Sequence, residues 1–409
     1  MIYNQTKYNN SWNTMKLKDL GSFARGKSKH RPRNDEKLFE GGGYPLIQTG
    51  EIKEANLFVT KHKLEYNEFG LAQSKLWDKG TLCITIAANI AETAILAYPM
   101  CFPDSIVGFN ANDDVCSELF MHYIFTYIKQ SIQNSASGSI QDNINIDYLE
   151  KLDFKIPNKS IQDKIVNVLY NIDKKVEINI NTITELENLS KMIYDYWFLQ
   201  FDFPNGNRKP YKSSGGEMVW SEELKQEIPN GWEIRELKDI IIEKDKSSIQ
   251  VNQAKNLKEK YPFFTSGNEI YSWKESITDG KNCYLSTGGS AFVKYYYGNS
   301  AYSTDTWCIS AKDNLEDYLY LSILSLGEIL NKKYFAGTGL KHLQKDLFKK
   351  RKFVIPPAKV LDSFNKITNN IFQTISKKYL ENKELEQLRD FLLPLIMNGQ
   401  VKPKNEQNN

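Results

Sequence analysis

The sequence of 409 residues has few of the residues that build disulfides and metal sites. Its five cysteines are odd in number and form no CxxC pair, and its four histidines are scattered at positions 30, 62, 122 and 342. Such spacing predicts reduced, buried cysteines of a cytoplasmic protein and no clustered metal site.

Long apolar runs are also missing. The nearest candidate for a membrane span, residues 82–98, has only 17 residues and contains Asn89 and Glu92, so it predicts two buried strands joined by a turn. The N-terminal MIYNQTKYNN is polar and lacks the apolar core of a secretory signal. We therefore expect a soluble, cytoplasmic protein.

Neither a strong charge nor a catalytic motif is present. The net charge is only +3, which by itself indicates no nucleic-acid binder, although a balanced total can hide a local basic face. The sequence has no Asn/Asp-Pro-Pro-aromatic turn of an amino-methyltransferase, and Pro103-Asp104 follows Glu51-Ile52-Lys53 rather than preceding it, as a metal-dependent nuclease requires. We predict a chain without catalytic residues of its own.

What the sequence does contain is a repeat. Residues 146–157 (IDYLEKLDFKIP) match residues 345–356 (KDLFKKRKFVIP) at an offset of 199, whereas Trp12 and its neighbours match Trp232 and its neighbours at an offset of 220. The helices after these segments thus stay in step while the globular parts differ in length. Two like halves are usually placed about a two-fold axis, and a DNA duplex is a two-fold object.

Each half consists of a strand-rich module and a long helix. Short β-branched and aromatic runs broken by Gly, Asn and Pro fill residues 12–157, with some helix around residues 116–131. Residues 159–196 contain no Pro or Gly, and their apolar residues follow the 4-3 spacing of a coiled-coil seam over about 55 Å. The seam residues that recur at the offset of 199 are Ile165, Ile172, Leu186 and Ile193 in the first helix and Phe364, Ile371, Leu385 and Leu392 in the second.

These patterns predict an α+β fold of two similar mixed α/β modules, each followed by a long helix. The two helices are expected to pack as an antiparallel coiled coil with pseudo-two-fold symmetry; separate helices that dock on other proteins are the alternative. The predicted domains are residues 1–157 (first module), 158–203 (first long helix), 204–231 (a Pro-, Gly- and Ser-rich linker), 232–356 (second module) and 357–400 (second long helix and tail).

Both seams contain a polar residue at the same position, Asn179 in the first helix and Lys378 in the second. A polar residue inside a seam costs stability and can fix register and partner. The alternative interpretation is that each lies where the seam opens to solvent.

Residues 21–28 (GSFARGKS) fit the phosphate-loop pattern GxxxxGK[ST] letter for letter. That loop needs a helix directly after it, with its N-terminus facing the phosphate. Pro32 follows soon after and no apolar helical period appears, and residues 241–248 of the second copy lack glycine. A phosphate-loop ATPase is therefore kept only as an alternative function.

The candidate DNA-binding residues lie in a basic strip and in small polar turns. The strip alternates cations over nine residues without an acid, a pattern suited to phosphate contacts: Arg25, Lys27, Lys29, Arg31 and Arg33. The turns offer hydroxyl, amide and cationic groups that suit base edges and phosphates: Gln48, Thr49, Thr265, Ser266, Thr287, Ser290, Lys294, Lys341 and His342. A further turn at residues 138–141 corresponds to residues 339–342. A solvated basic loop and ordinary hairpin turns are the alternative interpretations.

Over essentially its whole length the chain resembles the specificity subunit of type I restriction-modification systems. The resemblance is carried by the repeated order of module and helix, the junctions Ile156-Pro157 and Ile355-Pro356, and the text GGEMVWSEELKQEIPNGWE at residues 215–233. The segments TSGN, STGGS, YSTDTW and GTGLKH of the second module add to it.

The resemblance implies two target-recognition domains, each reading one half of a split sequence in double-stranded DNA, with the helices as spacer. It also implies partners: two modification subunits that bind S-adenosylmethionine and methylate adenine, and restriction subunits that use ATP and Mg. None of these cofactors would be bound by this chain. A coiled-coil scaffold without DNA binding is the remaining alternative.

Overall fold

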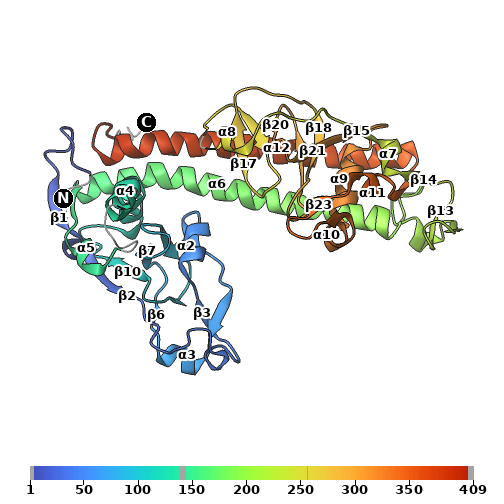
Figure 1. Cartoon of the computed structure of the whole chain (residues 1–409). Helices are drawn as coiled ribbons and strands as arrows, with labels where there is room; N and C mark the ends of the chain where they lie inside the picture. Colours follow the sequence, from blue (N-terminus) through green and yellow to red (C-terminus); the bar gives the residue numbers. More distant parts are fainter. Residues whose placement is uncertain (1–3, 138–143, 256, 404–409) are drawn as a thin grey trace. The chain divides into compact units, whose positions relative to one another are not determined.

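The computed structural model describes residues 4–137, 144–255 and 257–403, so the turn predicted at residues 138–141 lies outside the described residues. The chain forms two compact units (Figure 1). Unit 1 comprises Met1–Glu177 and Glu384–Asn409, and unit 2 comprises Ile178–Lys383. Each unit therefore contains one strand-rich module and a part of both long helices. The predicted α+β fold class is confirmed, whereas the predicted domain boundaries stay predictions.

Unit 1 is built on two mixed sheets. The larger has the strand order β2 (Gly21–Arg25), β10 (Ile106–Ala111), β7 (Leu82–Thr85), β8 (Thr93–Leu96) and β4 (Phe58–Val59). The smaller has the order β5 (Leu64–Tyr66), β3 (Tyr44–Leu46), β9 (Met100–Cys101) and β6 (Leu76–Trp77). Strands β7 and β8 pair antiparallel, which confirms the two buried strands predicted for residues 82–98.

The main helix of this module, α4 (Glu118–Ser137), packs on the larger sheet. Its apolar residues Phe120 and Ile124 share one core with Phe109 of β10 and with Ile165 and Leu169 of the first long helix. The shorter helices are α1 (Leu17–Leu20), η1 (Glu36–Leu38), α2 (Thr49–Glu54), α3 (Glu68–Ala72) and α5 (Ile146–Glu150).

Unit 2 repeats this plan with shorter sheets. Its larger sheet has the order β15 (Ile241–Glu243), β21 (Thr306–Ala311), β18 (Lys281–Ser286) and β19 (Val293–Tyr297), and its smaller one β17 (Ile270–Trp273), β16 (Tyr261–Phe264) and β20 (Ala301–Tyr302). Strands β22 (Phe335–Ala336) and β23 (His342–Leu343) form a hairpin. The helices are α7 (Leu237–Ile240), α8 (Val251–Ala254), α9 (Glu316–Leu324), α10 (Glu328–Tyr334) and α11 (Lys345–Lys349).

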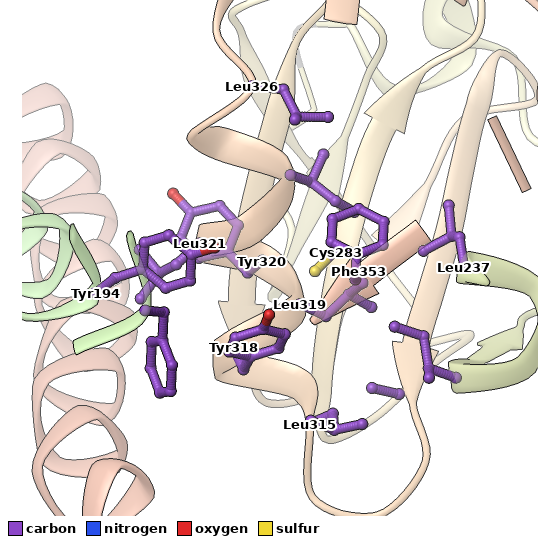
Figure 2. Packing of buried hydrophobic residues seen from close by; sticks show 14 of the residues in the cluster. Tyr194, Leu237, Cys283, Leu315, Tyr318, Leu319, Tyr320, Leu321, Leu326 and Phe353 are labelled. Carbon is purple, nitrogen blue, oxygen red and sulfur yellow. The ribbon is translucent and has the colours of Figure 1, made fainter. Parts of the chain in front are cut away.

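Helix α9 is the centre of this core, because it is buried on all sides. Figure 2 shows Leu319 and Tyr320 of α9 among the apolar side chains of the sheet, with Tyr194 of the first long helix nearby. The Tyr194 and Tyr318 rings lie 5.8 Å apart, so the helix and the module share one apolar interior.

The repeat is visible at the level of strand register. Strand β1 (Asn13–Lys16) pairs antiparallel with β11 (Asp153–Ile156), and β14 (Glu233–Glu236) pairs antiparallel with β24 (Lys352–Ile355). Asn13 lies opposite Ile156 in the first pair, and Glu233 lies opposite Ile355 in the second. The partners differ by 220 and 199 positions, the two offsets found in the sequence. The same pairing therefore closes both modules.

The segment predicted as a linker is folded. Within residues 204–231, strands β12 (Met218–Ser221) and β13 (Gln226–Pro229) form a hairpin after a 3-10 turn at Lys212–Ser214. Ile228 joins the core of unit 2, and the Tyr211 ring stacks on Phe203 at 4.6 Å. Its Pro-, Gly- and Ser-rich composition reflects turns rather than a free tether.

The long helices are α6 (Lys159–Tyr194), which continues as one π-helical turn (Asp195–Leu199), and α12 (Ala358–Met397). They run antiparallel in unit 2, because Asn179 of α6 contacts Asn382 whereas Trp197 contacts Phe364. Among the predicted seam residues, Ile165, Ile172, Phe364 and Ile371 are buried, and Leu186, Ile193, Leu385 and Leu392 are partly buried.

The polar seam residues meet each other in unit 2. The Lys378 ammonium donates to Asn179 Oδ1 at 2.8 Å, and Asn179 Nδ2 donates to Asn382 Oδ1 at 2.8 Å and Glu381 Oε2 at 2.9 Å. Asn179 is fully buried, so it does not lie where the seam opens to solvent. Since residues 179 and 378 are equivalent in the repeat, their contact marks the pseudo-two-fold axis of the helix pair.

All five cysteines are free and buried, as predicted. In the part of the chain that the structure describes, no helix has the length and apolarity needed to cross a membrane. Within the same residues, no cluster of His, Cys, Asp and Glu is arranged to hold a metal ion.

Candidate nucleic-acid interface

In unit 1 the basic strip is a loop whose backbone is clamped from two sides. The Gly26 N–H donates to the Ile106 carbonyl at 2.9 Å, and Gln73 Oε1 accepts from the N–H groups of Lys29 and His30. A Cβ on Gly26 would lie 2.3 Å from the Phe102 carbonyl oxygen, so only glycine fits against the sheet there. The strip is therefore held in place while its cationic side chains are exposed.

The five cationic side chains of the strip differ in whether they already have a partner within the chain. Arg33 pairs with Asp104 at 2.8 Å, and the Arg31 guanidinium donates to the Ser28 carbonyl at 2.6 Å. Among the residues that the structure describes, Arg25, Lys27 and Lys29 have no ion-pair partner. These three side chains are the ones available to contact phosphates.

The strip is not a phosphate loop. Residues Gly21–Arg25 form strand β2, which pairs with β10, and residues 26–35 that follow are not helical. The next helical turn is the short 3-10 helix η1, which begins at Glu36. Because no helix N-terminus follows Ser28, the arrangement needed to bind a nucleotide phosphate is missing. The ATPase alternative is therefore set aside.

A cleft of about 470 Å³ opens beside the strip. Arg33, Asn34 and Gln48 line it with guanidinium and amide groups, while Leu46 and Tyr66 contribute apolar surface. Arg and Asn or Gln are the side chains that pair with guanine and adenine in the major groove. Gln48 is exposed at the N-terminus of α2, and Thr49 is the first residue of that helix. This cleft is the candidate base-reading surface of unit 1.

Three loops that contain predicted residues converge in unit 2, namely residues 265–267, 287–290 and 339–342. The Ser266 hydroxyl and the Thr287 N–H both bond to the Asp305 carbonyl, the latter at 3.0 Å. The Gly289 N–H donates to the Lys341 carbonyl at 2.8 Å, which ties the third loop to the second. The structure thus brings together most of the predicted residues of this module, namely Thr265, Ser266, Thr287, Ser290, Lys341 and His342.

Lys294 holds one of these loops in place through hydrogen bonds. Its ammonium donates to the carbonyl oxygens of Thr265 and Gly267, the former at 3.2 Å. Burial lowers the pKa of Lys294 to about 8. The ammonium thus holds the Thr265–Gly267 turn and is engaged by carbonyl oxygens rather than directed toward solvent.

Other cations of unit 2 gather around Trp307. The Lys345 ammonium lies 5.1 Å from the Trp307 ring, and Lys349 forms an ion pair with Glu243, which also accepts from Trp307 Nε1 at 2.8 Å. Burial lowers the pKa of Lys345, and the neighbouring charges of Lys349 and Lys246 act in the same direction. The lysines near Trp307 therefore come from α11 and the Lys246 loop, whereas the basic strip of unit 1 comes from one continuous segment.

Sequence reasoning missed two residues of these surfaces. Asn34 lies in the cleft of unit 1, and Leu340, which is 65% exposed, lies at the converged loops of unit 2. A signal for Leu340 was present, because a large apolar residue between Gly339 and Lys341 is unusual in a loop.

Comparison with known proteins gives the same family for both halves of the chain. The type I restriction modification DNA specificity domain matches residues 9–188 and again residues 229–389. The chain is 22% identical to the type I restriction enzyme MjaIX specificity subunit of Methanocaldococcus jannaschii, over 96% of this chain and 94% of that protein. It is 24% identical to the HindI specificity subunit of Haemophilus influenzae, over 90% of this chain and 97% of that protein.

The fold has a counterpart among solved structures. The crystal structure of the S subunit of a type I restriction-modification system from M. genitalium superposes with a TM-score of 0.61, at 18% identity, over 97% of this chain and 99% of that one. The two matched segments cover most of the sequence and correspond to the two structural repeats. The chain therefore belongs to the type I restriction-modification specificity family and contains two copies of its DNA specificity domain.

Proposed function

We propose that each module reads one half of a bipartite sequence in double-stranded DNA, and that the chain performs no catalysis itself. The observation that carries this proposal is the pair of repeated modules, each with the same closing strands but a different set of polar loops. A shared scaffold with different loops suits a protein that reads two unlike half-sites.

The two surfaces offer the chemistry that DNA recognition needs. In unit 1, Lys27 and Lys29 would contact phosphates, while Asn34 and Gln48 would face base edges. In unit 2, the hydroxyls of Thr287 and Ser290, the Lys341 ammonium and the His342 imidazole would take these roles. Since the side chains differ, the two half-sites should differ in sequence.

The long helices would set the gap between the half-sites. Helix α6 is continuous from Lys159 to Tyr194, and each helical residue adds about 1.5 Å. The buried contact between Asn179 and Lys378 fixes the register of α6 against α12. A fixed register would give one fixed gap.

The same helices carry two equivalent apolar strips that suit partner docking. On α6, Leu189 and Met192 are 42% and 64% exposed; on α12, Leu388 and Phe391, at the offset of 199, are 46% and 65% exposed. Exposed apolar side chains at helical spacing mark protein contacts. Two like strips suit two copies of one partner, and the family indicates modification subunits. S-adenosylmethionine would be bound by those subunits, and ATP and Mg by restriction subunits.

The experiment combines the chain with its modification subunits and measures binding to target DNA against salt concentration. Replacing both Lys27 and Lys29 by Ala should reduce the slope of log K against log salt by about 2, since each phosphate contact contributes about 0.9. The matched control replaces Lys18 and Lys151, two exposed lysines near the β1–β11 pair of the same unit. A coiled-coil scaffold without DNA binding would show no salt-dependent affinity in any variant. An unchanged slope in the Lys27→Ala/Lys29→Ala variant would contradict the assigned phosphate contacts.

A further inference from the structure

Leu340 is exposed at a position where the fold gives it no role. It lies in the loop between β22 and β23, and 65% of its surface is accessible. Burying a leucine side chain completely is worth about 1.5–3 kcal/mol, and most of that is not gained here. Folding therefore does not explain an apolar side chain at this position.

The loop holds Leu340 in a defined place. The Gly289 N–H donates to the Lys341 carbonyl at 2.8 Å, and a β-bridge joins Gly288 to His342. Gly337 has a φ of +153°, and a Cβ there would lie 2.6 Å from the Leu340 carbonyl oxygen. The pairing of β22 with β23 closes the loop, and the contacts of Lys341 and His342 hold it directly after Leu340, so the exposed side chain has a defined position.

The surroundings of Leu340 are those of a DNA-contacting surface. The hydroxyl of Thr287 is on the turn beneath, and Lys341 and His342 follow directly in the chain with exposed cationic and imidazole groups. The nearby Gly288 and Gly289 carry no side chain that would keep the loop away from a base pair. Base pairs offer apolar partners in two forms, the thymine 5-methyl group in the major groove and the faces of unstacked bases.

We propose that Leu340 is a specificity-determining residue of unit 2 that makes apolar contact with the base pairs of its half-site. This inference rests on the proposed DNA-reading function and adds to it the residue and the kind of contact. Leu340 fills an apolar site on the DNA, while its polar neighbours contact phosphates and base edges. Unit 2 should then bind half-sites that lack this apolar partner more weakly.

The test uses the full chain with its modification subunits and the bipartite duplex that this complex methylates. The variants are Leu340→Ala and the conservative Leu340→Met, with Ile277→Ala as control, since Ile277 is a 43% exposed apolar residue of the same unit outside the three converged loops. We expect Leu340→Ala to lower kcat/KM for methylation about tenfold and to relax the motif at one position of one half-site. Leu340→Met should stay within about threefold of the original chain, and Ile277→Ala should match it, with unchanged thermal unfolding in all three.

Two modified duplexes distinguish the two forms of contact. If Leu340 touches a thymine methyl group, uracil in place of one thymine should reproduce the loss and add nothing to Leu340→Ala. If it enters the base stack, 2-aminopurine at the contacted step should brighten on binding of the original chain and not of Leu340→Ala. Equal methylation and an unchanged motif with Leu340→Ala would overturn the proposal while leaving the proposed function intact. Absence of any bipartite methylated motif with the original chain would overturn both.

Discussion

A buried carboxylate joins the helix pair to the module in both units, but it lies on opposite partners. In unit 1, Asp173 of α6 accepts from Tyr123 of the module at 2.7 Å and from Arg389 of α12 at 2.8 Å. In unit 2, Asp317 of the module accepts from Thr368 of α12 at 2.7 Å.

The repeat positions show how different these solutions are. Phe372, equivalent to Asp173, packs on the Tyr295 ring at 4.7 Å, and Ser190 is equivalent to Arg389. At the position where unit 1 has the ion pair of Asp173, unit 2 therefore has the aromatic ring of Phe372. The Asp317 carboxylate is instead paired with Lys281 at 3.0 Å within the module. The two modules thus share the same closing strands, but the buried carboxylate belongs to α6 in unit 1 and to the module in unit 2. Separate evolution of two modules on one scaffold would leave this pattern.

The largest difference between the two units is expected when the ion pair of unit 1 is removed. Arg389→Leu leaves Asp173, 3% exposed, without its cation and should cost about 3–5 kcal/mol of unfolding free energy. Replacing both Asp173 and Arg389 by Leu makes this contact apolar, as it is in unit 2. The double replacement should lower the unfolding free energy clearly less than Arg389→Leu alone. Hydrogen exchange read separately over the two units measures both. A double variant as unstable as the single one would mean that the two anchors are not alternatives.

Acid should weaken unit 1 more than unit 2. Burial lowers the pKa of His122 to about 4, although Asp173 acts in the opposite direction. The unfolded chain binds this proton below pH of about 6.5 and the folded chain does not, so stability is full above that pH and falls as the pH drops toward 4, by about 3 kcal/mol. The only histidine of unit 2, His342, is exposed.

Hydrogen exchange between pH 7 and pH 4.5 measures this difference, and His122→Gln is the control that removes the titrating group. The loss of protection in unit 1 should shrink in that variant. An equal loss in the variant and the original chain would assign the acid sensitivity to other groups.

Removing single hydroxyl groups tests whether the hydrogen bonds to Asp173 and to Asp317 stabilise their units equally. Tyr123→Phe in unit 1 and Thr368→Val in unit 2 each remove one donor to a buried aspartate and should cost about 1.5–3 kcal/mol. Denaturant unfolding of the two variants gives the values. A cost confined to one unit would show that only that anchor supports its module.

The smallest effect is expected on the helix surface. Lys191 and the half-buried Asp195 form a pair one turn apart at 2.6 Å, and Lys191→Ala should change stability by less than about 0.5 kcal/mol. Thermal unfolding of this variant serves as the baseline for the larger changes. A loss above 1 kcal/mol would show that the end of α6 does more than its surface contacts indicate.

The sequence could predict whatever depends on local periodicity. The helices, the antiparallel seam and the paired strands of residues 82–98 follow from apolar spacing, and the two offsets anticipate the register of Asn13 with Ile156 and of Glu233 with Ile355. It could not predict contacts between distant residues of unlike type. Asp173 and Arg389 are 216 positions apart and are not repeated, so no pattern joins them.

For the same reason, the sequence predicts only some features of the candidate site. Turn composition pointed to Thr287 and Lys341, which do converge, but it gave no direction for the Lys294 side chain, which points inward to carbonyl oxygens. The composition of residues 204–231 predicts a linker, because a hairpin without a regular apolar alternation has the sequence features of a flexible segment.

The most direct test of the account is the methylated motif of cells that carry this chain and its modification subunit, read by single-molecule sequencing. The original chain should give a bipartite motif with one fixed gap. Inserting four helical residues into α6 and the equivalent four into α12 lengthens the helix pair by about 6 Å and should widen the gap by one to two base pairs, since DNA rises about 3.4 Å per base pair. An unchanged gap, or a continuous motif, would contradict the proposal that paired helices separate two reading modules.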